Sequence, residues 1–196
     1  MIDKRSEKNR LREKYRAVRE AISKEEKEIL DKKICERFLS LVSYRFADTV
    51  LMYAPIRGEI DVDPIAAAAL KAGKRVAYPR CIGEDSRMFF HYVNSLSELE
   101  SGYFSIREPR VDAPLFDVSQ IQKREECICI IPALVYDKQG YRIGYGKGFY
   151  DRYLSNFKGT KAGIVYSSCI TDSIVHSKYD LSVDFIISER GVNIIK

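Results

Sequence analysis

Three glycines alternate with other residues in one short segment, and this spacing indicates a site for a polyphosphate. Gly144, Gly146 and Gly148 can adopt positive φ angles and let backbone amides come close to a ligand. Arg142 and Lys147 add positive charge to the same segment. A helix that begins after Gly148 would direct its positive amino end at the same ligand. The segment is therefore expected to bind the phosphates of a nucleotide.

The motif matches neither of the two common nucleotide fingerprints. Phe149 stands where a dinucleotide motif beginning at Gly144 needs its last glycine, and where a P-loop needs Lys-Ser or Lys-Thr. The context is nevertheless specific, because an apolar run (127–135) precedes the glycines and a helix-compatible run (149–154) follows them. A strand, a loop and a helix in this order favour a binding loop over an isolated tight turn.

These residues resemble the 5-formyltetrahydrofolate cyclo-ligases, also called methenyltetrahydrofolate synthetases. The hallmark of that family is Gly-x-Arg-Leu/Ile-Gly-x-Gly-x-Gly-Tyr/Phe-Tyr-Asp after a Pro-Ala/Gly-Leu strand, and residues 140–151 and 132–134 match it without departure. Similar segments extend over nearly the whole chain: 8–19, 53–60, 78–80, 102–109, 163–166 and 180–187. Two positions depart from the family pattern, since Cys169 replaces a usual Gln and Ser105 replaces a usual Gly. The first position concerns a ligand contact and the second a local turn.

The resemblance implies an ATP-dependent ring closure that converts 5-formyltetrahydrofolate to 5,10-methenyltetrahydrofolate, with ATP as co-substrate, Mg²⁺ as cofactor, and release of ADP and phosphate. A phosphoryl group on the formyl oxygen would make the formyl carbon electrophilic and turn its oxygen into a leaving group, after which N10 attacks. Phosphoryl transfer depends on positioning and charge stabilisation. We therefore expect no covalent enzyme intermediate.

The resemblance, together with residue charge, assigns a role to each site residue. The residues expected to bind ATP are Lys8, Arg12, Arg142, Gly144, Tyr145, Gly146, Lys147, Gly148, Phe149 and Tyr150. The residues expected to bind the folate are Ala54, Glu59, Tyr145, Phe149 and Tyr150, with Glu59 accepting hydrogen bonds and the aromatic rings stacking on the pterin. The residues expected to be catalytic are Lys147, Arg142 and Tyr150. Magnesium that bridges the phosphates would be held by Asp151 and Asp184.

Several of these residues also have a purely structural interpretation. Asp151 could cap the helix that follows the glycines, Asp184 could end a strand in solvent, and Phe149 could belong to the core. The two histidines, His91 and His176, are expected to be structural or exposed, because phosphoryl transfer needs no histidine.

A basic face is predicted for the first helix. Its four basic residues recur at i, i+4, i+8 and i+11: Lys8, Arg12, Arg16 and Arg19. An apolar stripe lies beside them, formed by Leu11, Tyr15, Val18 and Ile22. Such a face is often simply solvated. Beside a phosphate loop, Lys8 and Arg12 would instead complete a phosphate clamp.

Two other classes of function fit some of these features. An RNA- or nucleotide-binding module could use the basic helix, and the net charge of +5 is compatible with it. A kinase or acyl transferase acting on another carboxamide or carboxylate would keep the ATP clamp and replace Glu59 and the aromatic wall. The cyclo-ligase interpretation predicts reduced folate and ATP as the only partners, a monomer, and no nucleic acid or membrane.

Length and composition indicate one globular domain, residues 1–196. The chain has 196 residues and 45% hydrophobic content, which is enough for one core. Its amino end is charged from Asp3 onward and no apolar run approaches the roughly 20 residues of a membrane span, so we expect a cytoplasmic protein. Cys127 and Cys129, two of five cysteines, are expected to be buried reduced thiols.

The order of the predicted elements is typical of an α/β protein: a single three-layer α/β/α domain with a mostly parallel, Rossmann-like sheet and an N-terminal helical pair. Helices are predicted at 4–21, 24–43, 63–73, 95–99 and 149–154, and strands at 49–53, 75–78, 88–93, 127–131, 161–165 and 185–187. A long ordered excursion is predicted at 102–122. Ligands of such sheets collect beyond the carboxyl ends of the strands. We expect Glu59, Arg80, the glycine segment and residues 166–169 to meet there.

Overall fold

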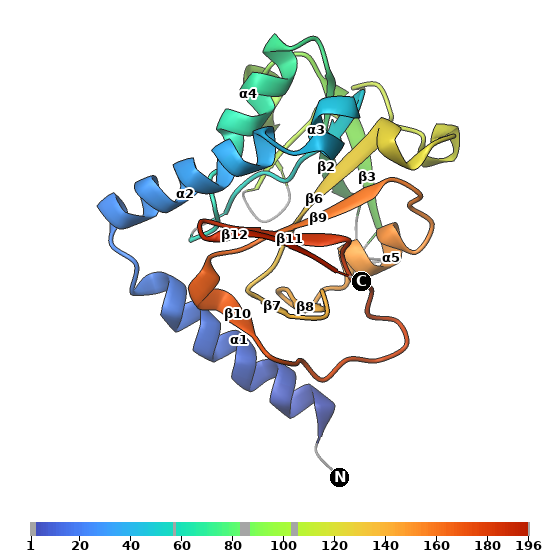
Figure 1. The fold of residues 1–196 in the computed structure, drawn as a ribbon. Helices are drawn as coiled ribbons and strands as arrows, with labels where there is room; N and C mark the ends of the chain where they lie inside the picture. Colours follow the sequence, from blue (N-terminus) through green and yellow to red (C-terminus); the bar gives the residue numbers. More distant parts are fainter. Residues whose placement is uncertain (1–2, 57, 83–86, 103–105, 196) are drawn as a thin grey trace.

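A seven-stranded sheet forms the centre of the protein in the computed structural model, which describes residues 3–56, 58–82, 87–102 and 106–195 (Figure 1). Its spatial order is β12-β11-β9-β6-β1-β2-β3. The strands are β1 (Thr49–Leu51), β2 (Arg75–Ile82), β3 (Arg87–Val93), β6 (Cys127–Pro132), β9 (Thr160–Ile164), β11 (Phe185–Ser188) and β12 (Gly191–Ile194). The five inner strands are parallel, and β3 and β12 pair antiparallel at the two edges.

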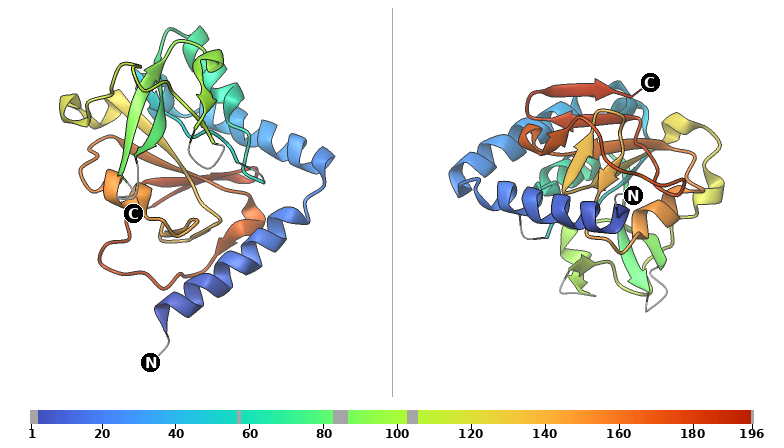
Figure 2. Two further views of the ribbon diagram at one scale, coloured as in Figure 1. Left: turned by 180° about the vertical axis from the view of Figure 1, so that it is seen from behind. Right: turned by 90° about the horizontal axis from the view of Figure 1, so that it is seen from below.

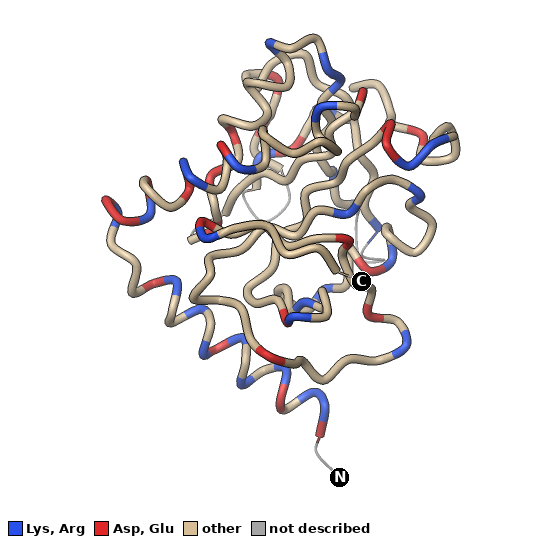
Figure 3. Tube along the Cα trace, in the orientation of Figure 1, with Lys and Arg blue, Asp and Glu red and all other residues tan. Residues whose placement is uncertain are grey.

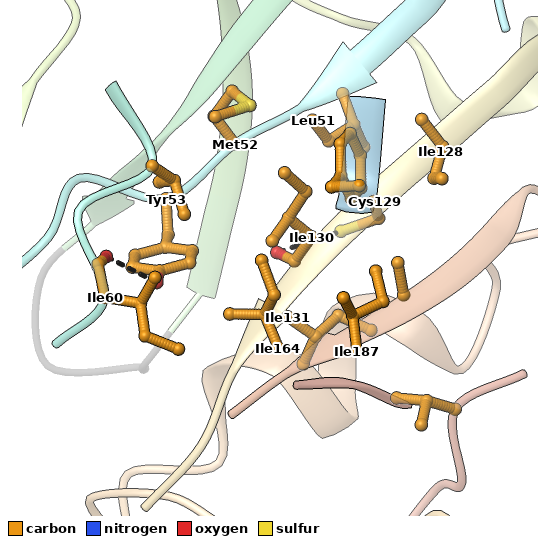
Figure 4. Close-up of a cluster of buried hydrophobic side chains, with 14 of the residues drawn as sticks. Leu51, Met52, Tyr53, Ile60, Ile128, Cys129, Ile130, Ile131, Ile164 and Ile187 are labelled. Carbon is orange, nitrogen blue, oxygen red and sulfur yellow. Dashed lines mark hydrogen bonds between the residues drawn. The ribbon is translucent and has the colours of Figure 1, made fainter. Parts of the chain in front are cut away.

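The core follows from the apolar character of the inner strands. Ile128, Ile130 and Ile131 are fully buried in β6, between β1 and β9, and Leu51 and Ile164 contribute from those two neighbours (Figure 4). A parallel strand that is covered on both faces needs apolar side chains on both faces. This explains why the run 127–131 shows no alternation of polar and apolar residues.

Helices cover both faces of this sheet. On one face, α2 (Lys24–Leu39) packs on β11 and α4 (Asp63–Lys71) packs on β2. On the other face, α5 (Phe149–Leu154) packs on β3, where the ring centroids of Tyr153 and Phe90 are 4.8 Å apart. The predicted three-layer α/β/α architecture with a mostly parallel sheet is confirmed.

The two N-terminal helices are both present, but they pack against different sheets (Figures 1 and 2). Helix α1 (Lys4–Glu20) lies across a small three-stranded sheet of β10 (Ile170–Thr171), β7 (Val135–Asp137) and β8 (Arg142–Ile143). Its predicted apolar stripe faces inward, with Leu11 and Tyr15 buried. The divergence of α1 from α2 leaves α1 beside the glycine segment rather than over the main sheet.

Two predicted element boundaries were wrong, and one small sheet was not predicted. The helix predicted at 24–43 ends at Leu39, and a separate helix α3 (Val42–Phe46) follows. Strand β2 continues through Pro79 instead of stopping there. Its pairing with β1 ends at Ala77, so the missing N–H of Pro79 falls where β2 has a partner on one side only. The small sheet was not predicted, because its strands have only two or three residues.

The described part of the predicted excursion at 102–122, which is residue 102 and residues 106–122, contains little regular structure. It includes β5 (Arg107–Glu108), which pairs with β4 (Glu100–Ser101), and the 3-10 turn η3 (Val118–Gln120). Two further 3-10 turns, η1 (Leu96–Glu98) and η4 (Arg124–Glu126), lie next to it in the chain. Ser105, one of the departures from the family pattern, lies outside the described residues. Another 3-10 turn, η5 (Ser167–Cys169), follows β9.

Candidate active site

The glycine segment forms a loop between β8 and α5, and two of its glycines need their special conformations. Gly146 has φ 93° and Gly148 has φ 69°, which side chains rarely tolerate. A Cβ atom on Gly146 would also lie 3.2 Å from the guanidinium carbon of Arg12. Helix α5 begins at Phe149, directly after the last glycine, as predicted. The loop can therefore bring its backbone close to α1 only because glycine occupies position 146.

Helix α1 supplies the opposite wall of this loop. Arg12 donates a hydrogen bond from Nε to the carbonyl oxygen of Gly144 at 3.0 Å and another from Nη1 to Asn9 at 2.6 Å. Lys8 and Arg12 are half-buried, whereas Arg16 is exposed. Of the four residues of the predicted basic face, Arg12 is bonded to the loop, Lys8 lines a cavity together with loop residues, and Arg16 faces solvent. Figure 3 shows the basic residues distributed along α1.

Two adjoining cavities open at this loop. The smaller, about 560 Å³, is mostly cationic and is lined by Lys4, Arg5, Lys8, Asn9, Arg12, Tyr145, Gly146, Lys147 and Ser177. The larger, about 840 Å³, shares five of these residues and extends to the carboxyl ends of β1 and β6. Its apolar part includes Tyr53, Ala54, Ile56, Pro79, Met88, Ile106 and Pro132. The loop therefore separates a charged opening from an apolar interior.

Glu59 is a carboxylate in the wall of the apolar interior. Only 5% of its surface is exposed, and its Oε2 accepts a hydrogen bond from the Ile56 amide at 3.0 Å. Burial raises the pKa of Glu59, while the Ile56 amide, the charge of Arg19 and hydrogen bonding to Tyr145 act in the opposite direction. Desolvation of the hydroxyl, with the nearby Glu59, raises the pKa of Tyr145 to about 12. The Tyr145 hydroxyl donates to Glu59, so the carboxylate keeps acceptor capacity for a flat polar ligand.

Arg142 is buried and already paired. Its Nη2 lies 2.9 Å from the Asp151 carboxylate, and its Nη1 donates to the carbonyl of Leu181 at 3.1 Å. The Leu181 amide in turn donates to Asp151 at 3.4 Å. Arg142 therefore joins α5 to the segment before β11, and both Arg142 and Asp151 line the larger cavity.

Asp184 does not lie in this site. It directly precedes β11, at the amino edge of the parallel sheet, where it accepts a hydrogen bond from the Lys161 amide at 2.7 Å and pairs with Arg124 at 2.5 Å. Asp180, four residues earlier, lines the larger cavity instead and lies 2.8 Å from Lys8. The structure thus brings Asp180, and not Asp184, to the edge where Asp151 lies.

Asp180 is held in its ionised form. Burial acts to raise its pKa, but hydrogen bonds from Lys8 and Ser177 outweigh that effect, so its pKa lies below the ordinary value. Among the described residues, no cluster of three or more metal-ligating side chains occurs. Two carboxylates suit Mg²⁺ better than a complete protein cage would, because Mg²⁺ in nucleotide sites keeps phosphate and water ligands.

The other residues predicted for the site also line the cavities. Lys147 lines both of them, and Phe149 and Tyr150 line the larger one. The hydroxyl of Tyr150 is buried and has no hydrogen-bond partner among the described residues, so it is available to a ligand. Ala54 follows β1 and forms part of the apolar wall.

Some residues expected at this edge do not reach the cavities. Arg80 turns away and donates to the carbonyl of Pro109 at 2.6 Å, although its neighbours in β2 line the larger cavity. Cys169 is fully buried beside Arg19 rather than exposed to a ligand. Arg19, which the helical spacing placed on the basic face, is also buried and donates to the carbonyl of Ala133. A buried arginine between apolar neighbours carries no distinct signal in the sequence.

The comparisons with known proteins agree with this geometry. A family model described as the 5-formyltetrahydrofolate cyclo-ligase family matches residues 4–189. The chain belongs to that family. It is therefore an enzyme of the ligase class.

Relatives and solved structures of the cyclo-ligase family span nearly the whole chain. The 5-formyltetrahydrofolate cyclo-ligase of Escherichia coli strain K12 is 26% identical over 90% of this chain and 97% of its own length. The one from Mycoplasma pneumoniae is 28% identical over 94% and 99%. The NMR structure of Aquifex aeolicus 5,10-methenyltetrahydrofolate synthetase superposes with a TM-score of 0.84 at 31% identity, covering 96% of this chain and 93% of that one.

No helix in the described part of the chain has the length and apolar character needed to cross a bilayer. All five cysteines are free, and Cys127 and Cys129 are buried as predicted.

Proposed function

We propose that this protein converts 5-formyltetrahydrofolate to 5,10-methenyltetrahydrofolate at the expense of ATP. The observation that carries the proposal is the junction at the glycine loop of a cationic opening with a largely apolar cavity, whose wall includes the buried carboxylates of Glu59 and Glu108. A polyphosphate and a flat, partly polar heterocycle need these two environments side by side. Family membership supplies the identity of the two substrates.

The phosphates of ATP are assigned to the cationic opening. Lys8, Arg12 and Lys147 line both cavities there, so their charges can act on the phosphoryl group that is transferred. Tyr145, Gly146 and Lys147 line this opening, and we assign the amides of residues 144–148 to the phosphate oxygens, with the positive φ angles of Gly146 and Gly148 allowing close approach. Arg142, predicted to bind ATP and to be catalytic, is paired with Asp151, and we assign to it the additional role of holding that carboxylate in place.

The pterin end of the folate is assigned to the apolar cavity. Ala54, Phe149 and Tyr145 form walls that suit a flat ring. The Glu59 carboxylate can accept hydrogen bonds from ring N–H groups, and the unpartnered Tyr150 hydroxyl can donate one to a ligand oxygen. A hydrogen-bond donor beside the formyl oxygen would stabilise the charge that develops while the phosphoryl group is transferred. We propose this catalytic role for Tyr150 together with Lys147.

Magnesium is assigned to Asp151 and Asp180. Both carboxylates line the larger cavity, whereas Asp184 lies at the opposite edge of the sheet. When bound, the ion would neutralise phosphate charge. Arg142 orients Asp151 for this task, and Lys8 would pass from Asp180 to a phosphate oxygen as Asp180 turns to the metal.

The chemistry proceeds in two steps. The γ-phosphoryl group moves to the formyl oxygen of the folate, and the bond to the β-phosphate oxygen breaks to release ADP. N10 then attacks the formyl carbon with its lone pair, loses its proton, and the carbon–oxygen bond breaks to release phosphate. The protein orients the reactants and stabilises charge. All residues assigned to these roles come from one chain, so a monomer suffices, and the five free cysteines suit the cytoplasm.

A direct assay tests the proposal. 5,10-Methenyltetrahydrofolate absorbs in the near ultraviolet, so its formation from 5-formyltetrahydrofolate, ATP and Mg²⁺ can be followed continuously. We expect steady product formation that requires ATP, and its loss when ATP is omitted. A folded protein that binds RNA with strong salt dependence and forms no methenyl product would overturn the proposal in favour of a nucleic-acid-binding module.

A further inference from the structure

Asp31 is a buried carboxylate on α2 that lines neither cavity. Its side chain accepts a hydrogen bond from the Tyr166 hydroxyl at 2.6 Å, another from the Asp61 amide at 2.9 Å, and a third from Lys27. Only 6% of Asp31 is exposed. A charge removed from water is costly unless it is hydrogen-bonded, and here both carboxylate oxygens of Asp31 accept hydrogen bonds. These bonds connect α2 to two other segments of the chain.

The peptide group between Ile60 and Asp61 is hydrogen-bonded at both of its polar atoms. The N–H of Asp61 donates to Asp31, and the carbonyl oxygen of Ile60 accepts a hydrogen bond from the Tyr53 hydroxyl at 2.8 Å (Figure 4). Ile60 itself is buried. Both polar atoms of one peptide group are therefore fixed by side chains, a constraint that no strand or helix imposes at this point of the chain.

This fixed peptide group lies one residue beyond Glu59, between Ile60 and Asp61. On the other side of Glu59, a turn is closed by its own amide, which donates to the Ile56 carbonyl at 2.9 Å. Its carboxylate accepts from the Ile56 amide at 3.0 Å. Because the backbone on both sides of Glu59 is held, its carboxylate has one position in the cavity wall. Loops that carry binding residues gain affinity when their conformation is fixed in advance.

Asp31 also connects this turn to the rest of the sheet edge. Tyr166 follows β9 and Asp61 follows β1, and β6 separates these two strands in the sheet. Tyr166 is 1% exposed. One carboxylate thus joins the carboxyl ends of two strands that are not neighbours. Both Glu59 and Pro132, the last residue of β6, line the larger cavity at this edge of the sheet.

We propose that Asp31 is a positioning residue for the folate: together with Tyr53 it clamps the Ile60–Asp61 peptide group and so fixes the Glu59 carboxylate in the apolar cavity. This inference rests on the proposed function, because it assigns Glu59 to the folate. It distinguishes the two substrates, since the clamp is linked to the apolar cavity and not to the cationic opening.

Steady-state kinetics of Asp31→Ala test the inference. We expect KM for 5-formyltetrahydrofolate to rise about tenfold, the effect of losing one or two buried hydrogen bonds, with KM for ATP unchanged. Asp31→Asn can still accept from the Asp61 amide and should restore most of the folate affinity. Glu126→Ala is the matched control, because Glu126 also accepts backbone amides, at 3.2 and 3.3 Å, but at the amino end of β6. It should leave both KM values unchanged.

A double-mutant cycle separates positioning from general stability. If Asp31 acts through Glu59, Asp31→Ala should add little to the folate KM of a Glu59→Gln protein. Tyr166→Phe, which keeps the ring and frees one oxygen of Asp31, covers the case in which Asp31→Ala does not fold. It should raise the folate KM by about threefold and leave the ATP KM unchanged.

The outcomes are distinguishable. A wild-type protein that forms no methenyl product contradicts the proposed function. An active wild-type protein whose Asp31→Ala or Tyr166→Phe variant keeps its folate KM, or changes both KM values equally, overturns the inference and leaves the function standing. Full additivity with Glu59→Gln would also overturn it.

Discussion

The ammonium group of Lys8 lies 2.8 Å from the carboxylate of Asp180, so a residue that we propose to bind phosphate and a carboxylate that we propose to bind magnesium form an ion pair. This ion pair joins α1 to the segment before β11. Binding of the nucleotide with its metal offers each residue a stronger partner, a phosphate oxygen for Lys8 and a divalent cation for Asp180. The two elements are therefore joined by charge before the substrates arrive.

The phosphate clamp predicts a selective loss of nucleotide affinity. Lys8→Ala and Arg12→Ala should each raise KM for ATP about tenfold or more, because a charge-assisted hydrogen bond contributes about 1.5 to 3 kcal/mol. Arg16→Ala, on the exposed side of the same helix, is the control. Steady-state kinetics with varied ATP provide the measurement. If all three variants have the same KM for ATP, the basic face of the helix is only a solvated surface.

The metal site predicts a difference between three aspartates. Asp151→Asn and Asp180→Asn keep the size of the side chain but remove the charge that Mg²⁺ needs, so activity should fall and should partly return at higher Mg²⁺. Asp184→Asn should keep wild-type Mg²⁺ dependence and lose at most about 1 kcal/mol of stability with its Arg124 ion pair. Activity as a function of Mg²⁺ concentration distinguishes them. A Mg²⁺ requirement that shifts only in Asp184→Asn would contradict the assignment.

Glu59 predicts a pH dependence of folate binding. Its pKa is raised by burial, so the carboxylate becomes protonated at a higher pH than an ordinary Glu. The folate KM should therefore rise as the pH falls through this raised pKa, while the ATP KM does not. The contribution of Glu59 to folding stability depends on pH in the opposite direction. It is fully present below the pKa that Glu59 has in the unfolded chain, and it is lost as the pH rises through the raised pKa of the folded protein. Glu59→Gln should remove the acidic limb from a profile of folate KM against pH, and a limb that persists in this variant belongs to another group.

Gly146→Ala tests the need for a close loop. The variant must place a Cβ 3.2 Å from the Arg12 guanidinium at φ 93°, at a cost of about 1 to 2 kcal/mol for the backbone alone. We expect weaker ATP binding and a lower melting temperature. Gly191→Ala is matched to it, since nothing lies within 4 Å of its Cβ and its φ is not positive. Should both variants bind ATP equally well, the loop would not depend on glycine at 146.

The sequence predicts the layers and the loop well, because both depend on local patterns. The glycines, the helix from Phe149 and the apolar strand from Cys127 follow from periodicity and turn chemistry. The position of Asp184 away from the cavities could also have been predicted from the sequence. A residue just before the parallel strand β11 must lie at its amino end, opposite the edge where ligands bind.

Other features depend on long-range packing and carry no local signal. The bond between Arg142 and Asp151 joins residues from a small sheet and a helix, and helical spacing alone assigned Arg19 to the solvated face although it is buried. Asp31 belongs to the same class, since its partners Asp61 and Tyr166 are 30 and 135 residues away in the chain. Spacing within one helix cannot reveal such contacts.

The fate of the formyl oxygen tests the central claim most directly. If the γ-phosphoryl group is transferred to that oxygen, 5-formyltetrahydrofolate labelled with ¹⁸O in the formyl group should give phosphate that carries one ¹⁸O atom per molecule of 5,10-methenyltetrahydrofolate. Mass spectrometry of the released phosphate measures this ratio. Unlabelled phosphate, with the ¹⁸O recovered in water, would contradict transfer to the formyl oxygen and with it the proposed use of the two cavities.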